Sequence, residues 1–322
     1  MSQTNPFPLT ALRLRFHCMA ETRVQLGGLR AGSNLRGALV NVMRRATCAG
    51  SPSDAEHLTV CPVCWLIAAN DRPGQERRGY VITPPLNAGE SLEPRMEFDF
   101  HITLFGEAVR YLPYFVLAVP ETGRAGAGPG RGRFALKSIH AEYPSAKDHV
   151  VLKAGENVVY PPQKKIRHAD IQETSKKFFE GLEYEQPCLR FDFFTPLRLI
   201  VDDRLLKSPD FGAFFNHLLR RIDELASQHA GSEDRPLEER QRLWSLADRV
   251  RLVESGTSWV DVSSGSSRTG QPTWISGLIG SARYVAPKEV WDALLPWLFW
   301  GEFVQVGKDT SKGNGVYRMA VD

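Results

Sequence analysis

The chain has 322 residues, enough for two domains of ordinary size that each bury a hydrophobic core. Hydrophobic residues make up 42% and charged residues 24%, a globular composition that excludes a disordered protein. The formal net charge is only +3, so a nucleic-acid surface would have to come from local clusters of basic residues.

The amino-terminal residues contain no apolar run of the signal-peptide type, and no stretch of about 18 apolar residues predicts a membrane span. We therefore expect a cytoplasmic protein. In that compartment the five cysteines are expected to be free thiols or metal ligands rather than disulfides.

The first two predicted elements are a strand and a helix, and both carry basic residues. Alternation over residues 9–22 predicts a half-buried strand whose open face carries Arg13, Arg15 and His17. Helical spacing of apolar residues over 32–48 predicts a helix with Ser33 as its N-cap. This helix buries one side and presents three arginines elsewhere, namely Arg36, Arg44 and Arg45.

Four further elements complete the first half of the chain. Strands are predicted near residues 80–83 and over 96–104, then a helix over 106–119 that restarts near Pro113, then a strand over 134–143. The order strand, helix, strand, strand, helix, strand is the ferredoxin-like order, which RNA-recognition domains share.

Residues 144–187 are richer in Pro, Lys and Glu, and we expect them to form a connector. The pattern then restarts with a strand over 189–201, a helix over 208–226 with Ser208 as cap, strands over 249–262 and 274–284, a helix over 288–299 and a final strand. We therefore predict an α+β protein of two tandem ferredoxin-like, RNA-recognition-like domains, residues 1–143 and 188–322. The first would carry a zinc-type insertion near 48–64.

Each half closes with a helix, a glycine-rich loop and a strand. In the first loop, ETGRAGAGPGRGRF, glycines alternate with Arg124, Arg131 and Arg133, and the second loop, GKDTSKGNG, carries Lys308 and Lys312. Glycine permits close backbone approach, and successive N–H groups beside cationic side chains can hold a phosphate. The alternative is a pair of mobile loops whose charges only contact water.

Two nucleotide-binding classes are excluded by spacing. The stretch GEFVQVGKD has five residues rather than four between Gly301 and Gly307, and Asp309 stands where a P-loop requires Ser or Thr. The first glycine loop follows a helix and precedes a strand, which is the reverse of a dinucleotide fingerprint. ATPase and dehydrogenase functions are therefore not expected.

Several segments occur in an order that resembles the CRISPR repeat-processing endoribonucleases of the RAMP superfamily. These segments are LRGALVNVMRR, CPVC, HITLFGEAVRYLPYFVLAV with GRGRF, FFTPLRL, and GEFVQVGKDTSKGNGVYRM, and they span nearly the whole chain. The resemblance implies tandem ferredoxin-like domains, cleavage of the repeat transcript without a metal, and delivery of guide RNA to an effector complex. The partners it implies are CRISPR repeat RNA, the processed guide RNA and other effector subunits.

The chain departs from its relatives at two positions, because Asn41 and Gln305 stand where relatives often carry histidine. Two alternatives therefore remain open: an inactive RNA-binding subunit of an effector complex, and a structural subunit that mainly contacts proteins. The predicted RNA contacts are the basic residues Arg13, Arg15, Arg36, Arg44, Arg45, Arg124, Arg131, Arg133, Arg268, Lys308 and Lys312.

The reaction that the resemblance implies is attack of a ribose 2′-hydroxyl on the adjacent phosphate. It needs a base, an acid and a cation that stabilises the phosphorane charge. Histidine suits either proton role and Lys308 suits the cationic one. If the first and third strands pair at their centres, His17 falls near Glu97, Arg15 near Asp99 and Arg13 near His101, which makes His17 the candidate. The alternative is a solvated sheet face of complementary charges.

The cysteines form a separate pattern. Cys61 and Cys64 make a CxxC pair that Cys48 and His57 precede, so these four residues could ligate a structural zinc. A degenerate site without metal is the alternative, because the outer spacings match no standard finger. Neither interpretation makes a metal part of catalysis.

Overall fold

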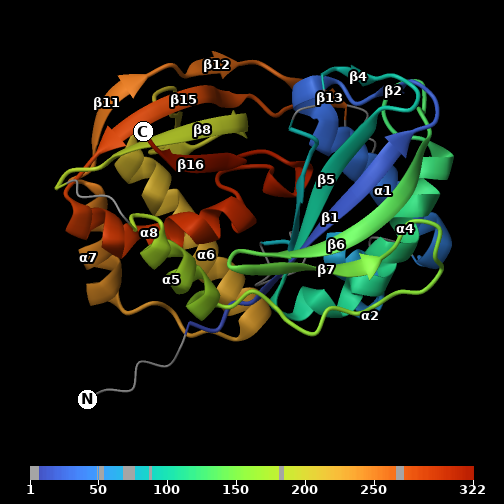
Figure 1. Cartoon of the computed structure of the whole chain (residues 1–322), viewed down its shortest axis with the longest axis horizontal. Coiled ribbons are helices and arrows are strands. Elements are labelled where there is room, and N and C mark those ends of the chain that lie inside the picture. Colours follow the sequence, from blue (N-terminus) through green and yellow to red (C-terminus); the bar gives the residue numbers. More distant parts are fainter. Residues whose placement is uncertain are drawn as a thin grey trace.

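The structure is a computed structural model. It describes residues 7–48, 50, 54–67, 77–86, 89–180, 185–265 and 272–322. Two antiparallel sheets stand side by side, the first in the right half and the second in the upper left of Figure 1. Within these residues we find no helix with both the length and the apolar character needed to cross a bilayer.

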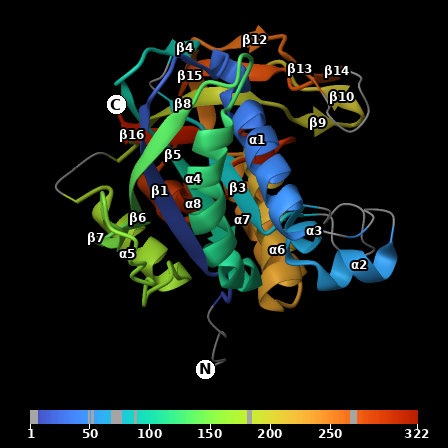
Figure 2. The ribbon, with the colours of Figure 1, turned by 90° about the vertical axis from the view of Figure 1, so that its right-hand side faces the viewer.

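The first sheet has the strand order β3-β5-β1-β6-β7. Its strands are β1 (Ala11–Ala20), β3 (Tyr80–Thr83), β5 (Glu97–Phe105), β6 (Phe134–Tyr143) and β7 (Ala146–Leu152). The helices α1 (Ala31–Thr47) and α4 (Leu112–Ala125) follow β1 and β5 and cover the same face of the sheet (Figure 2). Apart from β7, this is the ferredoxin-like topology predicted from the sequence.

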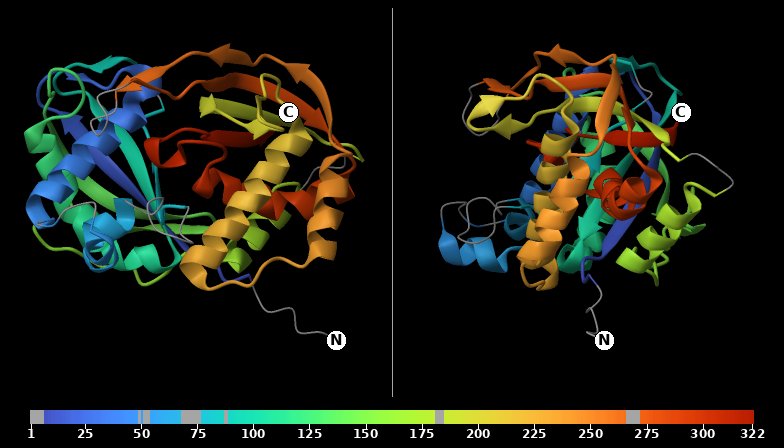
Figure 3. Two further views of the ribbon diagram at one scale, coloured as in Figure 1. Left: turned by 180° about the vertical axis from the view of Figure 1, so that it is seen from behind. Right: turned by 90° about the vertical axis from the view of Figure 1, so that its left-hand side faces the viewer.

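The second sheet repeats that topology with the order β11-β15-β8-β16. Its strands are β8 (Cys188–Leu197), β11 (Arg251–Ser255), β15 (Gly277–Val285) and β16 (Tyr317–Val321), and β12 (Ser258–Val260) also pairs with β15. The helices are α6 (Phe211–Ala230), α7 (Leu237–Ala247) and α8 (Lys288–Val304), which Figure 3 shows from behind. The tandem ferredoxin-like α+β architecture is therefore confirmed.

The remaining elements are short. Three two-stranded sheets pair β2 (Val24–Gln25) with β4 (Ser91–Leu92), β9 (Ile200–Val201) with β10 (Arg204–Leu205), and β13 (Ser263–Gly265) with β14 (Pro272–Trp274). The short helices are α2 (Ala55–Val60), α3 (Pro62–Ile67) and α5 (His168–Lys177), and 3-10 turns lie at Gly28–Arg30, Gly106–Tyr111 and Thr310–Lys312. The stretch 144–187, expected to be a connector, contains β7 of the first sheet and α5, which packs on α8.

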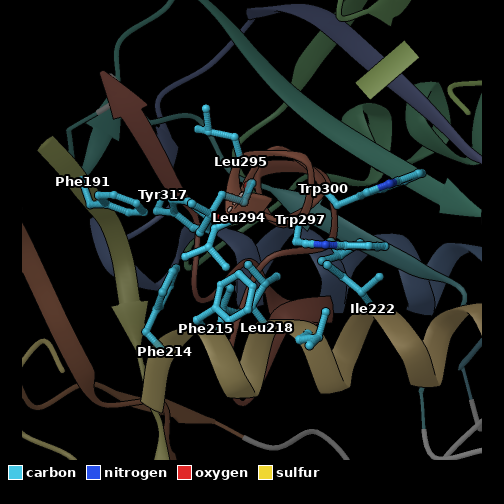
Figure 4. Close-up of a cluster of buried hydrophobic side chains, with 14 of the residues drawn as sticks. Phe191, Phe214, Phe215, Leu218, Ile222, Leu294, Leu295, Trp297, Trp300 and Tyr317 are labelled. Carbon is cyan, nitrogen blue, oxygen red and sulfur yellow. Dashed lines mark hydrogen bonds between the residues drawn. The ribbon is translucent and has the colours of Figure 1, made fainter. Parts of the chain in front are cut away.

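The core of the second half is rich in aromatic residues and extends into the first half. In Figure 4, Phe214, Phe215 and Leu218 of α6 lie opposite Leu294 and Trp297 of α8. The same buried cluster includes four residues of the first half, Leu9, Ala11, Val81 and Phe105. Full burial of such side chains contributes about 1.5–3 kcal/mol each, so this shared core holds the two halves together.

Both predicted helix caps were wrong. The helix α1 begins at Ala31, so Ser33 lies inside its first turn and the N-cap position falls on Arg30. The cap of α6 is Asp210, two residues beyond the predicted Ser208. Its carboxylate accepts a hydrogen bond from the N–H of Ala213. Capping geometry depends on where the backbone leaves the helix, which periodicity locates only within a residue or two.

Candidate nucleic-acid interface

The first glycine loop (residues 126–133) joins α4 to β6 and packs on the chain that leaves β1. A Cβ atom added to Gly128 would collide with the carbonyl of Gln25, and one added to Gly132 would collide with the carbonyl of Arg23. The N–H of Arg133 donates to Oγ1 of Thr22 at 2.8 Å. Glycine is required here because one backbone lies directly against another.

The second glycine loop (residues 305–316) joins α8 to β16 and contacts the first domain. Nε2 of Gln305 donates to the carbonyl of Ile82 at 2.9 Å and lies 3.1 Å from Oγ1 of Thr83. A Cβ on Gly32, in the first turn of α1, would collide with the carbonyl of Lys312. This loop therefore lies between the start of α1 and the end of β3.

Both loops lie at the same end of the first sheet. The first loop leads into Phe134, which pairs with Ala20 at the end of β1, and the second loop contacts the end of β3. Residues 25 and 32, which touch one loop each, are seven positions apart and thus separated by at most about 25 Å. The points at which the two loops touch the first domain are therefore no more than about 25 Å apart.

The exposed basic side chains at this end include Arg30, Arg131, Arg133 and Lys308. Among the described residues, none of these four forms an ion pair with a carboxylate. The other two predicted loop contacts are already paired, Arg124 with Glu121 and Lys312 with Asp309 at 2.8 Å. Arg30 was not among the predicted RNA contacts, and it is the 3-10 turn before α1 that brings it here.

The arginines of α1 are spread along the helix. Nε of Arg36 donates to the hydroxyl of Tyr80 at 3.1 Å near the second loop. Arg44 and Arg45 occupy the last turn, about 20 Å from the first turn at 1.5 Å per residue. They lie beside Cys48 rather than beside the glycine loops. Arg268 lies outside the described residues.

The two positions at which relatives often carry histidine differ in exposure. Asn41 is exposed on α1, whereas Gln305 is buried. Since its amide donates to the first domain, Gln305 links the two domains and does not face solvent.

His17 lies on the face of the first sheet that α1 and α4 leave uncovered. It pairs with Asp99 in the strand register, not with Glu97, so the predicted pairing was wrong by two residues. A two-residue shift keeps each side chain on its face. Nδ1 of His17 therefore still faces a carboxylate, Asp99 Oδ1 at 2.7 Å, and Nε2 lies 3.5 Å from Glu97.

The same face carries a buried ion-pair network below His17. Nε of Arg13 lies 3.1 Å from Glu142, and Nε2 of His101 lies 3.3 Å from the same carboxylate. Burial raises the pKa of Glu142, but the hydrogen bond from His101 and the positive charges of Arg13 and Arg15 outweigh it and lower the pKa to about 2. Burial lowers the pKa of Arg13 to about 10, and nearby Arg318 contributes.

This network joins the domains more than it faces solvent. Arg13 is 4% exposed, donates to the carbonyl of Glu302 and lies over the ring of Phe303. Arg15 pairs with Glu142 and Asp148. Both arginines therefore already have partners within the protein. His17 is three residues from Ala20, the end of β1 that the first glycine loop reaches, which is about 10 Å along the strand.

His17 and Lys308, the two predicted catalytic residues, are not in contact. The loop that carries Lys308 reaches β3, while His17 lies on β1, and β5 separates these strands. Two strand spacings amount to about 10 Å. The structure thus brings both residues to the same end of the sheet without joining them.

The four predicted zinc ligands come together at the far end of α1. Sγ of Cys48 lies 3.3 Å from Nε2 of His57 and 3.5 Å from Sγ of Cys64, and the ligand atoms of all four residues lie within 4.8 Å of one another. Burial, followed by the neighbouring thiols of Cys48 and Cys61, raises the pKa of Cys64 to about 12. Cys18 and Cys188 lie on strands of the two sheets, outside this cluster.

Comparison with known proteins agrees with this architecture. Residues 191–317 match the family model of the CRISPR-associated endoribonuclease Cas6, and residues 8–164 match a model described as an N-terminal domain. The second half of the chain is therefore similar in sequence to the CRISPR-associated endoribonuclease Cas6.

The solved structures of Cas6 proteins share the fold at low sequence identity. A Thermus thermophilus Cas6 is 13% identical with a TM-score of 0.55, covering 97% of this chain and 98% of its own. A Cas6 product complex is 14% identical with a TM-score of 0.56, covering 97% and 99%. A partial Cas6-RT-Cas1–Cas2 complex contains a chain that is 10% identical with a TM-score of 0.62. That match covers 98% of this chain and 46% of the other.

One relative resembles the chain over most of its length. An uncharacterized protein of Archaeoglobus fulgidus is 25% identical over 294 residues, which cover 89% of this chain and 91% of the relative.

Proposed function

We propose that this protein binds CRISPR repeat RNA and cleaves the precursor transcript without a metal, to give guide RNAs for an effector complex. The observation that carries the proposal is the packing of both glycine loops against the first domain, beside four exposed basic residues that form no ion pair within the described part of the chain. Combined with the match of residues 191–317 to the Cas6 family model, these basic residues favour RNA over other polyanions.

The RNA backbone would lie across the first loop and the start of α1. Arg131 and Arg133 extend from the first loop, Arg30 precedes the helix, and Lys308 extends from the second loop. The first turn of α1 holds no acidic residue, so the partial positive charge of the helix end adds to these cations. Such contacts position a phosphate chain but read no sequence.

The chemistry we assign is attack of a 2′-hydroxyl on the adjacent phosphorus. The P–O bond to the 5′ oxygen breaks, leaving a 2′,3′-cyclic phosphate on one product and a 5′-hydroxyl on the other. A base takes the 2′ proton and an acid gives a proton to the departing oxygen, while a cation stabilises the phosphorane. No step uses a metal, and we assign the cluster of Cys48, His57, Cys61 and Cys64 no part in cleavage.

We assign His17 to proton transfer and Asp99 to its orientation. The Asp99 carboxylate, 2.7 Å from Nδ1, fixes the orientation of the imidazole. Glu97 lies 3.5 Å from the other nitrogen, and we assign His17 the transfer of a proton to the leaving oxygen. We assign Lys308 to charge stabilisation, which requires the bound RNA to reach both side chains.

The test is single-turnover cleavage of end-labelled repeat RNA in excess chelator. His17→Ala should slow cleavage about 10²–10⁴-fold, the usual contribution of a positioned acid or base. His149→Ala is the matched control. His149 lies on edge strand β7, away from both loops, and its Nε2 lies 3.0 Å from the carbonyl of Tyr160. Circular dichroism in the same buffer checks that each protein is folded.

Unchanged cleavage by His17→Ala would remove His17 from the mechanism but leave the nuclease proposal standing. A shift in electrophoretic mobility without cutting by the wild type would instead support the second candidate, an inactive RNA-binding subunit of an effector complex. The burial of Gln305 favours that candidate, because the position cannot supply the side chain that relatives often present there. If the wild type neither binds nor cleaves the repeat RNA, the result would indicate a structural subunit.

A further inference from the structure

We infer that Cys48, His57, Cys61 and Cys64 bind one structural zinc ion, and that this ion holds the α2–α3 segment in place as a latch between the two domains. The site lies at the carboxyl end of α1, remote from both glycine loops, and contributes to folding rather than to cleavage.

The geometry fits a tetrahedral zinc. With zinc–sulfur bonds of about 2.3 Å and zinc–nitrogen bonds of about 2.0–2.1 Å, neighbouring ligand atoms in a tetrahedron lie about 3.4–3.8 Å apart. The ligand atoms of Cys48, His57 and Cys64 lie 3.3, 3.5 and 3.5 Å from one another. Three sulfurs and one imidazole form a closed ligand set, which is typical of structural rather than catalytic zinc.

The backbone around the ligands is arranged to bring them together. Cys48 is the C-cap residue of α1 and Cys61 is the C-cap residue of α2, while His57 lies within α2 and Cys64 within α3. Gly50 lies directly against the His57 ring, and a Cβ there would collide with Nδ1. Three helix segments thus converge on one point.

Neither α2 nor α3 is expected to be stable alone. Each contains six residues, whereas isolated helices shorter than about 12–15 residues are marginal in water. Of the four ligands, Cys61 and Cys64 are buried, and their thiols cannot both stay protonated if they are to bind a cation. Metal binding would replace the weak contacts among these thiols by four strong bonds.

The consequence reaches the second domain through Trp65, which follows the ligand Cys64. The Trp65 ring lies 5.0 Å from Tyr111 of the first domain and 5.7 Å edge-on from His229 at the end of α6. The guanidinium of Arg110 lies 5.1 Å over the same ring. Since Trp65 is only 7% exposed, folding of α3 on the metal fixes a buried contact between the domains.

The experiment is elemental analysis and thermal unfolding of the full chain, purified without added metal. We expect one zinc per chain in the wild type and in Cys188→Ser, a cysteine outside the cluster. Cys64→Ser should contain no zinc, and its melting temperature should be lower than that of the wild type by about 5 °C or more. His57→Cys should keep one zinc, because four cysteines form an equally good site.

Two further measurements remain decisive if Cys64→Ser does not fold. Trp65→Ala should keep its zinc but melt lower, which separates the latch contact from metal binding. Cobalt substitution of the wild type should give the strong visible absorption of a tetrahedral thiolate site. Wild type that binds neither metal, or whose thiol titration reveals a disulfide among Cys48, Cys61 and Cys64, would overturn the proposal. A melting temperature unchanged by Trp65→Ala would overturn the latch.

Discussion

The two glycine loops look alike in sequence but differ in their surroundings. The first exposes Gly130, Arg131 and Arg133 to solvent, whereas in the second Gly313, Asn314 and Gly315 are all buried. Asn314 donates to the carbonyl of Ile275 at 3.1 Å and contributes to the packing of the second loop. The first loop is therefore mainly exposed to solvent, whereas the second is mainly a joint between the domains, with Lys308 on its exposed side.

This difference shows that glycine and basic residues can alternate for two reasons. In both loops glycine allows one backbone to lie against another, which says nothing about phosphate. Only the exposure and the ion pairs of the basic side chains distinguish a binding loop from a structural one, and neither can be read from spacing.

Equivalent glycine substitutions should have the largest effect on this comparison. Gly315 and Gly130 both have positive φ values, 72° and 80°. A Cβ on Gly315 would collide with the carbonyl of Val306, while one on Gly130 meets only the end of Gln25 at 4.0 Å. We expect Gly315→Ala to cost about 3 kcal/mol or more in the free energy of unfolding, and Gly130→Ala about 1 kcal/mol. Urea unfolding measures both, and equal costs would contradict the distinction.

Acid should weaken the ion-pair network of Arg13 and Glu142, which lies at the junction of the two domains, whereas the first loop is held by backbone packing and by the hydrogen bond of Arg133 to Thr22. The pKa of Glu142 is lowered to about 2 from an ordinary 4.5, with burial opposing the shift and His101, Arg13 and Arg15 producing it. Its stabilisation is complete above pH 4.5 and is lost as the pH falls toward 2, on the order of 2 kcal/mol.

The measurement is urea unfolding between pH 7 and pH 2.5 for the wild type and two variants. Glu142→Gln should be less stable at neutral pH and should lose less on acidification. Glu185→Gln, which removes an exposed carboxylate, should follow the wild type. A Glu142→Gln curve parallel to the wild type would show that the network contributes no pH-dependent stability.

Salt dependence of RNA binding should give the smallest effect. Arg131→Ala with Arg133→Ala should reduce the slope of log affinity against log salt by about 1.4–1.8, because each phosphate contact to a single strand contributes about 0.7–0.9. Lys308→Ala with Lys312→Ala should reduce it by only about 0.7–0.9, since Lys312 is paired with Asp309. The reverse order would make the second loop the main RNA contact.

Periodicity predicted most of the two domains correctly. The strands β1, β5 and β8 and the helices α1, α6 and α8 have regular apolar spacing that their burial requires, so their positions follow from the sequence. The helix α7 was missed because only Leu243 and Ala247 of its eleven residues are buried, which leaves almost no apolar stripe. The strand β7 was missed for a similar reason, being an edge strand with one buried residue.

The candidate sites depend on long-range packing that no local pattern encodes. The cluster of cysteines and histidine was predictable because CxxC constrains its own geometry, whereas the His17 register depends on where β5 starts and was wrong by two residues. Arg30 was overlooked because it becomes important only once the 3-10 turn places it before α1. Likewise, the burial of Gln305 follows from the docking of two domains, which sequence alone does not specify.

The contact of Gln305 with the carbonyl of Ile82 has a consequence for fragments of this protein. The strand β3 is the outermost strand of the first sheet, and this amide from the other half of the chain occupies part of its unpaired backbone. A polypeptide cut between the two sheets would leave β3 as a bare edge and expose Leu9, Val81 and Phe105. Bare apolar edges recruit strands from other molecules, so the separated amino-terminal half should aggregate rather than remain monomeric.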